Sequence, residues 1–299
     1  MIKIPNSKSE MQIAEGESQD KFRIPNSEFA NPVFELSHVE FAYGEQVALK
    51  DINLTVRPGE RIVLLGANGS GKSTLLKILD ALYWPTRGEF CAFGAPMTPA
   101  HMDDETSALA FRRRVGLVFQ DPDVQLFSPT VWDEVTFAPL HLGLSRQEVI
   151  ERAEWAMDLL GITKLRDRAP HRLSGGEKKK VALASVLSLR PDVWLLDEPT
   201  AALDPRSKSR LLDFLEDLEA EGKTVITATH DLDIVEEISD RVIMFCEEHE
   251  ITVEGAPHDV LADEERLVAC NLLHVHRHKH GPVEHAHPHL HVTPHEHEH

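Results

Sequence analysis

The sequence contains few cysteines, only two tyrosines and no long apolar run. Its three cysteines, Cys91, Cys246 and Cys270, lie too far apart to suggest a disulfide framework or a zinc cage. No apolar stretch approaches the roughly 20 residues that a membrane-spanning helix needs. Residues 1–31 also lack the apolar segment of a secretion signal. We therefore expect reduced thiols and a cytoplasmic chain that does not itself cross a membrane.

Basic residues are scarce as well. The 299 residues include 31 Lys and Arg against 50 Asp and Glu, which gives a net charge of −19. Such a surface repels nucleic-acid backbones and the anionic inner face of a membrane. We therefore expect no nucleic-acid partner, and any place at a membrane would depend on a protein partner. An apolar fraction of 41% still predicts a folded core.

The order of elements predicts an α/β fold. Residues 1–31 form a polar leader that carries Ile-Pro-Asn-Ser twice, and we expect it to be disordered, with a docking peptide as the alternative. From Val33 onward, alternating strand patterns are followed by short apolar strands separated by helical stretches. This predicts a largely parallel sheet covered by helices, with antiparallel strands near the N-terminus. Residues 121–172 lack strand patterns and predict an inserted helical subdomain.

A phosphate-binding loop lies between a predicted strand and a predicted helix. Its sequence fits G-x-x-x-x-G-K-[ST], in which glycines let successive backbone N–H groups surround a phosphate at a helix N-terminus. The lysine bridges the β- and γ-phosphates, and the following serine hydroxyl binds Mg²⁺. The predicted nucleotide-binding residues here are Gly66, Ala67, Asn68, Gly69, Ser70, Gly71, Lys72, Ser73 and Thr74.

A pair of acidic residues follows another apolar strand. Asp197 and Glu198 come directly after Val193–Leu196, at the end of the strand where parallel sheets bind ligands. We expect Asp197 to orient Mg²⁺ and Glu198 to polarise the attacking water. A guanine-reading N-K-x-D element is absent from the sequence, which argues against a GTPase.

Residues 173–177, Leu-Ser-Gly-Gly-Glu, precede a basic stretch and a helix. This segment resembles the signature of ATP-binding-cassette (ABC) proteins, and the resemblance extends from Val33 to Ala262. In that family the signature contacts the γ-phosphate held by a partner subunit, which implies ATP and Mg²⁺ as ligands and a head-to-tail dimer, here expected to be a homodimer. The resemblance assigns nucleotide contacts to Ser174, Gly175 and Gly176. Glu177 stands where the family usually has glutamine, and we expect its carboxylate to face away from phosphate.

Other residues match the family one at a time. Gln120 matches the glutamine that senses Mg²⁺ and water, and His230 matches the histidine that contacts the γ-phosphate. Tyr43 matches the aromatic residue that stacks on adenine. Residues 202–204, Ala-Leu-Asp, match the loop that crosses the dimer, although the family usually has serine at the first of these positions. The resemblance therefore implies an ATPase in which Lys72, Gln120, Glu198 and His230 act in catalysis.

The segment from Gln120 to Leu144 resembles the ATPase subunits of energy-coupling-factor importers, particularly those for cobalt and nickel. In those proteins this region forms a groove for a helix of the transmembrane component. The resemblance implies a peripheral subunit on the cytoplasmic face, partnered by a transmembrane coupling component and a substrate-binding membrane component. Nickel or cobalt is the expected cargo, and a vitamin such as biotin is the alternative.

The C-terminal segment is rich in histidine. Residues 263–273 are expected to form a helical extension, and residues 274–299 a disordered tail. Neutral imidazoles bind Ni²⁺, Co²⁺, Cu²⁺ and Zn²⁺. The tail therefore predicts a second metal site, although a solvated tail or a metal-storage protein would carry the same composition. The candidate ligands are His274, His276, His278, His280, His285, His287, His289, His291, His295, His297 and His299.

Overall fold

The computed structural model describes the backbone of residues 31–280 and 283–290, and the side chains of residues 31–273. Residues 1–30 of the predicted leader and residues 291–299 of the predicted tail lie outside this range. No helix in the described part is both long and apolar enough to cross a bilayer.

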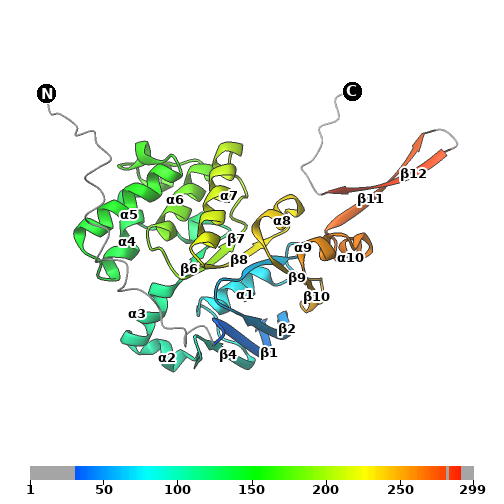
Figure 1. Cartoon of the computed structure of the whole chain (residues 1–299), viewed down its shortest axis with the longest axis horizontal. Helices are drawn as coiled ribbons and strands as arrows, with labels where there is room; N and C mark the ends of the chain where they lie inside the picture. The colour runs from blue at the N-terminus through cyan, green and yellow to red at the C-terminus, as the bar shows by residue number, and fades with distance from the viewer. Residues whose placement is uncertain (1–30, 281–282, 291–299) are drawn as a thin grey trace, which may run out of the picture. The chain divides into compact units, whose positions relative to one another are not determined.

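A six-stranded sheet with the order β10-β9-β3-β8-β7-β6 forms the centre of the fold (Figure 1). All neighbouring pairs are parallel except β10 and β9. This confirms the largely parallel sheet that the short apolar runs predicted, because strands buried on both faces need apolar residues throughout. The strands are β3 (Arg61–Leu65), β6 (Val115–Val118), β7 (Val193–Asp197), β8 (Thr224–Thr229), β9 (Arg241–Phe245) and β10 (Ile251–Gly255).

A second sheet of four antiparallel strands has the order β2-β1-β4-β5. Its strands are β1 (Phe34–Tyr43), β2 (Gln46–Val56), β4 (Arg87–Ala92) and β5 (Ala95–Pro96). The sequence predicted β1 and β2 from their alternation. It did not predict β4, whose burial pattern has three exposed residues in succession and no clean period of two.

Helices cover both faces of the central sheet. On one face, Ile62 and Leu64 of β3 pack with the buried side of α1 and with the antiparallel sheet. On the other face, Val63 and Leu65 pack with α4 to α7. The helices are α1 (Lys72–Leu79), α2 (Pro99–Asp103), α3 (Glu105–Arg114), α4 (Val131–His141), α5 (Arg146–Leu159), α6 (Gly175–Leu187), α7 (Pro205–Ala220), α8 (Val235–Ile238), α9 (Pro257–Leu261) and α10 (Glu264–Ala269).

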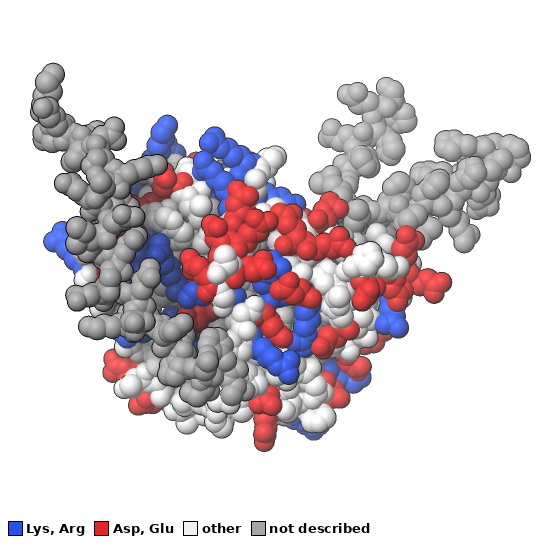
Figure 2. Space-filling view, in the orientation of Figure 1, with Lys and Arg blue, Asp and Glu red and all other residues white. Residues whose placement is uncertain are grey.

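Acidic side chains gather over α7 and α8 on the face shown in Figure 2. Both helices expose several carboxylates, among them Glu216, Asp217 and Glu219 of α7 and Glu236 and Glu237 of α8. These helices therefore form an acidic patch on this face.

The C-terminal part differs from the sequence predictions in two respects. Cys246 and Cys270, expected to be free thiols, are joined by a disulfide with Cα atoms 4.7 Å apart. The chain folds back through α9 and α10, and this brings together residues 24 positions apart, which sequence spacing alone does not reveal. Cys91 is unpaired.

Residues predicted to be a disordered tail instead form part of an antiparallel hairpin of β11 (Leu273–His280) and β12 (Val283–Leu290). The composition suggested disorder, but the histidines alternate with other residues at the strand period of two. Pro288 lies within β12, where proline is tolerated because a two-stranded ribbon has only edge strands.

Asp80 is buried at the C-terminal end of α1, where Arg112 of α3 pairs with it. Arg112 Nη1 lies 3.1 Å from Asp80 Oδ2 and 2.9 Å from the Asp80 carbonyl oxygen. Burial raises the pKa of Asp80 to about 7, although the Arg112 charge opposes the rise. The folded state therefore holds this proton at pH values where the unfolded chain, with an Asp pKa of 3.8, has lost it.

We predict that Asp80→Asn changes the pH dependence of stability. Below pH 4, protonated Asp80 contributes its full stabilisation to the wild-type protein. This stabilisation is lost as the pH rises towards 7. Asparagine does not titrate, so the variant shows no such loss. Between pH 5 and 8 the free energy of unfolding of the wild type should fall relative to the variant by about 3 kcal/mol. Urea titrations across this range measure the difference, and parallel curves for the two proteins would contradict the assignment.

Candidate nucleotide site

The phosphate loop joins β3 to α1 as predicted, and its glycines are required by geometry. Gly69 and Gly71 have φ angles of 86° and 112°, which side chains other than glycine rarely adopt. A Cβ atom on Gly66 would lie 2.8 Å from the carbonyl oxygen of Phe245, and one on Gly71 would lie 2.5 Å from that of Ala48. The backbone therefore wraps tightly at the N-terminus of α1, where its N–H groups can bind an anion.

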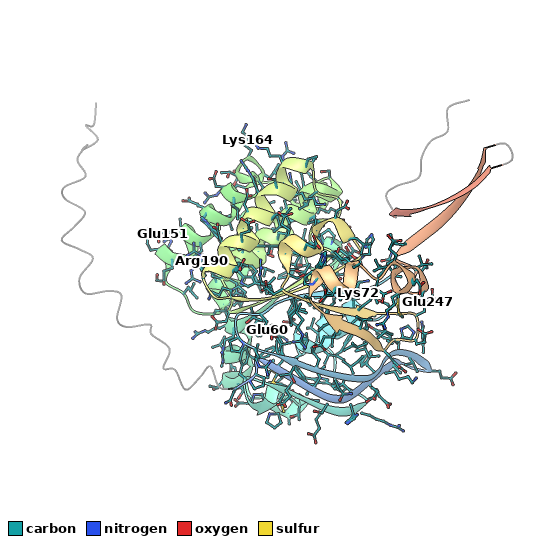
Figure 3. All side chains as sticks on the ribbon, turned by 45° about the vertical axis from the view of Figure 1, so that its right-hand side comes forward. Glu60, Lys72, Glu151, Lys164, Arg190 and Glu247 are labelled. Carbon is teal, nitrogen blue, oxygen red and sulfur yellow. A yellow bond between two sulfur atoms is a disulfide. The ribbon has the colours of Figure 1, made fainter. Side chains whose placement is uncertain are left out.

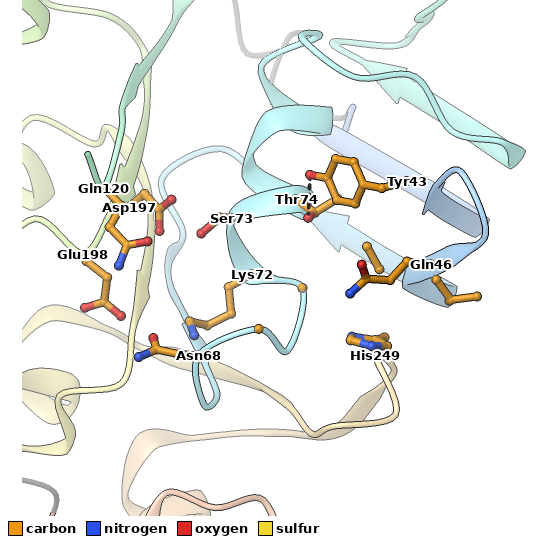
Figure 4. Close-up of a pocket in the computed structure, with 14 residues that line it drawn as sticks. Tyr43, Gln46, Asn68, Lys72, Ser73, Thr74, Gln120, Asp197, Glu198 and His249 are labelled. Atoms are coloured by element: carbon orange, nitrogen blue, oxygen red, sulfur yellow. Dashed lines mark hydrogen bonds between the residues drawn. The ribbon is translucent and has the colours of Figure 1, made fainter. Parts of the chain in front are cut away.

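A pocket of about 390 Å³ opens beside this loop (Figure 4). Asp197, Glu198 and Gln120 lie on one side of Lys72, and Tyr43, Gln46 and His249 lie on the other. The pocket therefore brings together most of the residues predicted from separate motifs. Those that line it are Tyr43, Asn68, Gly69, Gly71, Lys72, Ser73, Thr74, Gln120, Asp197 and Glu198.

Lys72, labelled in Figure 3, is almost fully buried. Its Nζ donates to the carbonyl oxygens of Gly66 and Ala67 at 2.7 and 3.0 Å. Burial lowers the pKa of Lys72, while the charges of Glu198 and Asp197 oppose this shift. The ammonium group is thus held at the mouth of the loop, where a phosphate would replace its carbonyl partners.

Asp197 ends β7 and is almost fully buried. Burial raises its pKa, while hydrogen bonding to Ser73 opposes the rise. Its Oδ1 atom has no hydrogen-bond partner among the described residues. A buried carboxylate oxygen without a partner, next to a serine hydroxyl and the Gln120 side chain, fits the oxygen ligands that Mg²⁺ prefers.

Glu198 has a strained backbone and a fixed side chain. Its φ angle is 46°, in the left-handed region that non-glycine residues rarely occupy. The carboxylate accepts a hydrogen bond from Thr229 Oγ1 at 3.2 Å, and His230 Nδ1 lies 2.6 Å from its other oxygen. Glu198 and His230 are therefore coupled directly, which the sequence could not show because 32 positions separate them.

Lys178, Lys179 and Lys180 have functions that the sequence analysis missed. Lys179 is buried, and its Nζ donates to the carbonyl oxygens of Phe119, Gln120 and Asp197 at 2.9, 3.2 and 3.1 Å. Burial lowers the pKa of Lys179 to about 8. It therefore fixes the N-terminal part of α6 to the ends of β6 and β7.

The two flanking lysines make further links from α6. Lys178 pairs with Asp123 at 2.6 Å and Lys180 with Asp204 at 2.5 Å. These carboxylates lie in the segment after Gln120 and in the predicted dimer-crossing loop. A run of lysines is usually a solvated surface, and only the tertiary structure shows three different anchors.

Ser174, Gly175 and Gly176 begin α6 and do not line the pocket. Ser174 and Glu177 form a capping box, in which the carboxylate accepts from the Ser174 backbone N–H at 2.8 Å. Hydrogen bonds from Ser174 lower the pKa of Glu177. The Glu177 carboxylate is therefore occupied by the cap. The N–H groups of the two glycines remain at a helix N-terminus outside this chain's own pocket.

The opposite side of the pocket combines the predicted Tyr43 with residues that the sequence analysis missed. Tyr43 lies with its hydroxyl 3.2 Å from Thr74 Oγ1, and its ring packs edge-on against Phe41 and Tyr83. Gln46, Val47, Ala48 and His249 complete this wall. His249 Nδ1 is buried without a hydrogen-bond partner in the described part. No motif marks His249, since it reaches the pocket from the turn between β9 and β10.

Comparison with known proteins places the chain in a family. The family model described as ABC transporter matches residues 49–201. The nickel import ATP-binding protein NikO of Rhodobacter capsulatus is 49% identical over 245 residues, covering 81% of this chain and 96% of that protein.

Two solved structures show the same fold. CbiO1 of Clostridium perfringens, described as part of the ABC transporter complex CbiONQ, has a TM-score of 0.65 and 36% identity over 81% of this chain and 95% of that one. The cassette MJ0796, solved as a dimer in a post-hydrolysis state with ADP and phosphate, has a TM-score of 0.67 and 29% identity over 75% of this chain and 98% of that one. With these matches and the geometry of its pocket, the chain belongs to the ABC transporter family, as one of its ATP-hydrolysing ATP-binding proteins.

Proposed function

We propose that the chain hydrolyses ATP to drive uptake of a transition-metal ion, nickel or cobalt, as a dimer docked on the cytoplasmic face of a transmembrane component. The observation that carries the proposal is the pocket that joins Lys72, Asp197 and Glu198, together with the exclusion of the α6 N-terminus from it. A vitamin such as biotin is the second candidate cargo, from the resemblance to energy-coupling-factor importers.

Hydrolysis in this pocket depends on positioning and charge. Lys72 and the loop amides bind the β- and γ-phosphates, and Tyr43 and His249 line the side where the base would lie. Bound Mg²⁺ supplies positive charge that offsets charge on the transferring group, and Ser73, Gln120 and Asp197 would hold it. Glu198 accepts a proton or hydrogen bond from the attacking water, and His230 fixes the carboxylate.

Among the described residues that line the pocket, only the phosphate loop offers backbone N–H groups at a helix N-terminus, so one chain would bind a γ-phosphate in this way from one side only. The N–H groups of Gly175 and Gly176 have the chemistry for that position but lie outside the pocket. Two chains arranged head to tail would each supply this helix N-terminus to the other. MJ0796, a similar cassette, was solved as a dimer with ADP and phosphate, which supports the arrangement.

An apolar groove of about 490 Å³ supports docking on a membrane component. It lies between α3, α4 and the end of α6, and Phe127 and Phe137 meet in it with ring centroids 4.8 Å apart. Phe127 is 67% exposed, which is unusual for a large apolar side chain. A partner helix that inserts an apolar face would cover these rings. Among the residues that the structure describes, none lines both the groove and the nucleotide pocket.

The identity of the cargo is supported by three observations. The residues after Gln120 resemble those of cobalt and nickel importers, NikO is a named nickel import protein, and the C-terminal segment is rich in imidazole. A metal-storage protein would share only the last of these features, and it would not need a complete set of ATP-hydrolysing residues.

We predict that Glu198→Gln lowers ATP turnover by about 10²–10⁴-fold while ATP binding remains, because the amide cannot accept the proton of water. A phosphate-release assay and nucleotide titration measure the two effects. Glu151→Gln on α5 is the matched control, since that carboxylate contacts only Gln147 in the described part and should leave turnover unchanged. Wild-type turnover in Glu198→Gln would show that another group activates the water.

Cells that contain this subunit and its membrane partners should accumulate labelled nickel or cobalt but not labelled biotin. The same cells with Glu198→Gln should accumulate neither, because an ATP-bound dimer that cannot hydrolyse ATP does not reopen to complete a transport cycle. Uptake of biotin alone would favour the vitamin importer. Metal accumulation that persists in Glu198→Gln would favour storage and contradict the proposal.

A further inference from the structure

The hairpin of β11 and β12 places histidines opposite one another in pairs. Its register matches His274 with His289, His276 with His287, and His278 with His285. Sequence alone shows that histidines alternate along two segments. Only the strand pairing shows that a histidine position is paired with a histidine position at three successive alternate places in the register.

These six histidines share one face of the hairpin. Successive residues of a strand belong to opposite faces, and the six occupy alternate positions on both strands. The other face carries Val275, Arg277 and Lys279 of β11, opposite Pro288, Ala286 and Glu284 of β12. Within the described residues 273–280 and 283–290, candidate metal ligands are therefore concentrated on a single face, and Glu284 alone belongs to the other.

Pro288 fixes the hydrogen-bonding type of the histidine pairs. Proline has no N–H group, so the pair Val275 and Pro288 cannot exchange two backbone hydrogen bonds. Pair types alternate along an antiparallel ladder, and the three histidine pairs are therefore all of the hydrogen-bonded type. Such pairs hold their Cα atoms about 5.5 Å apart, and neighbouring pairs follow at about 6.8 Å along the strand.

This spacing suits a metal ion. Two imidazoles that bind one ion need nitrogen atoms about 2.0–2.1 Å from it, a distance that side chains on directly opposite strand positions can span. A flexible histidine tail would lose conformational freedom on binding, whereas strand pairing holds opposite positions together in advance. Among the side chains of residues 31–273, no group of three or more His, Cys, Asp or Glu could hold a metal.

We propose that the β11–β12 hairpin is a binding site for a divalent transition-metal ion, with the cross-strand histidine pairs as ligands. The site takes ions that prefer imidazole, namely Ni²⁺, Co²⁺, Cu²⁺ and Zn²⁺, and it does not select Mg²⁺ or Ca²⁺. It deepens the proposed metal transport by giving the ATPase subunit its own place for the ion. Binding itself does not depend on ATP or on the membrane partners.

The test exchanges neighbouring residues, so that composition stays constant while one imidazole moves to the other face. On β11, H276R/R277H moves the histidine from position 276 to position 277. On β12, A286H/H287A moves it from position 287 to position 286. Each exchange alone breaks the central pair and should weaken Ni²⁺ binding by roughly tenfold. The two exchanges together place imidazoles at positions 277 and 286, which are also partners in the register, and should recover most of the loss.

Binding of Ni²⁺ alone is measured by calorimetry on the untagged full chain, with ATP turnover as the control for folding of each variant. Equal Ni²⁺ affinities in the wild type, in each single exchange and in their combination would mean that histidine content alone determines binding. This result would overturn the proposal. If the protein with both exchanges loses as much Ni²⁺-binding free energy as the two single exchanges lose together, the proposed pairing is contradicted. None of these outcomes bears on the proposed import, which the uptake assay tests separately.

Discussion

One buried ammonium group, Lys179 Nζ, joins the signature helix to the catalytic edge of the central sheet. It donates to carbonyl oxygens of Gln120 and Asp197, which follow β6 and end β7. A buried lysine is costly to hold unless its donors are satisfied, and here three carbonyl groups satisfy them. Because α6 begins with the glycines that would face the partner's nucleotide, the same helix connects one site of the dimer with the other.

This connection gives a physical basis for coupling between the two sites. Lys178 and Lys180 extend it to Asp123 and Asp204, so α6 is tied to the segments that follow β6 and β7. The Glu198 backbone, held at a φ of 46°, sits directly after the strand that Lys179 anchors. A shift of α6 on dimer closure would therefore move the carbonyl of Asp197 and the position of Glu198 together. The groove at the end of α6 would transmit the same shift to a membrane partner.

Local patterns were sufficient to predict the phosphate loop, the acidic pair and the parallel sheet, because each depends on residues close together in the sequence. The structure confirmed that β3, the loop and α1 follow one another, and that Asp197 ends a buried strand. Residues that act across the fold were missed. His249 reaches the pocket from a turn, the three lysines bind loops far along the chain, and Cys246 meets Cys270 through chain reversal. The sequence predicts a disordered tail where the structure has the hairpin, because composition does not reveal strand register.

In the proposed dimer, each ATP site is shared between two chains. The most direct measurement mixes two inactive variants, Lys72→Ala in the phosphate loop and Gly175→Asp in the signature. In a mixed dimer one site combines both defects, and the other combines an intact loop with an intact signature. Each variant alone should show almost no ATP turnover, and an equal mixture should regain about a quarter of the wild-type rate. A mixture as inactive as its components, or full activity in a strictly monomeric wild-type chain, would contradict the account.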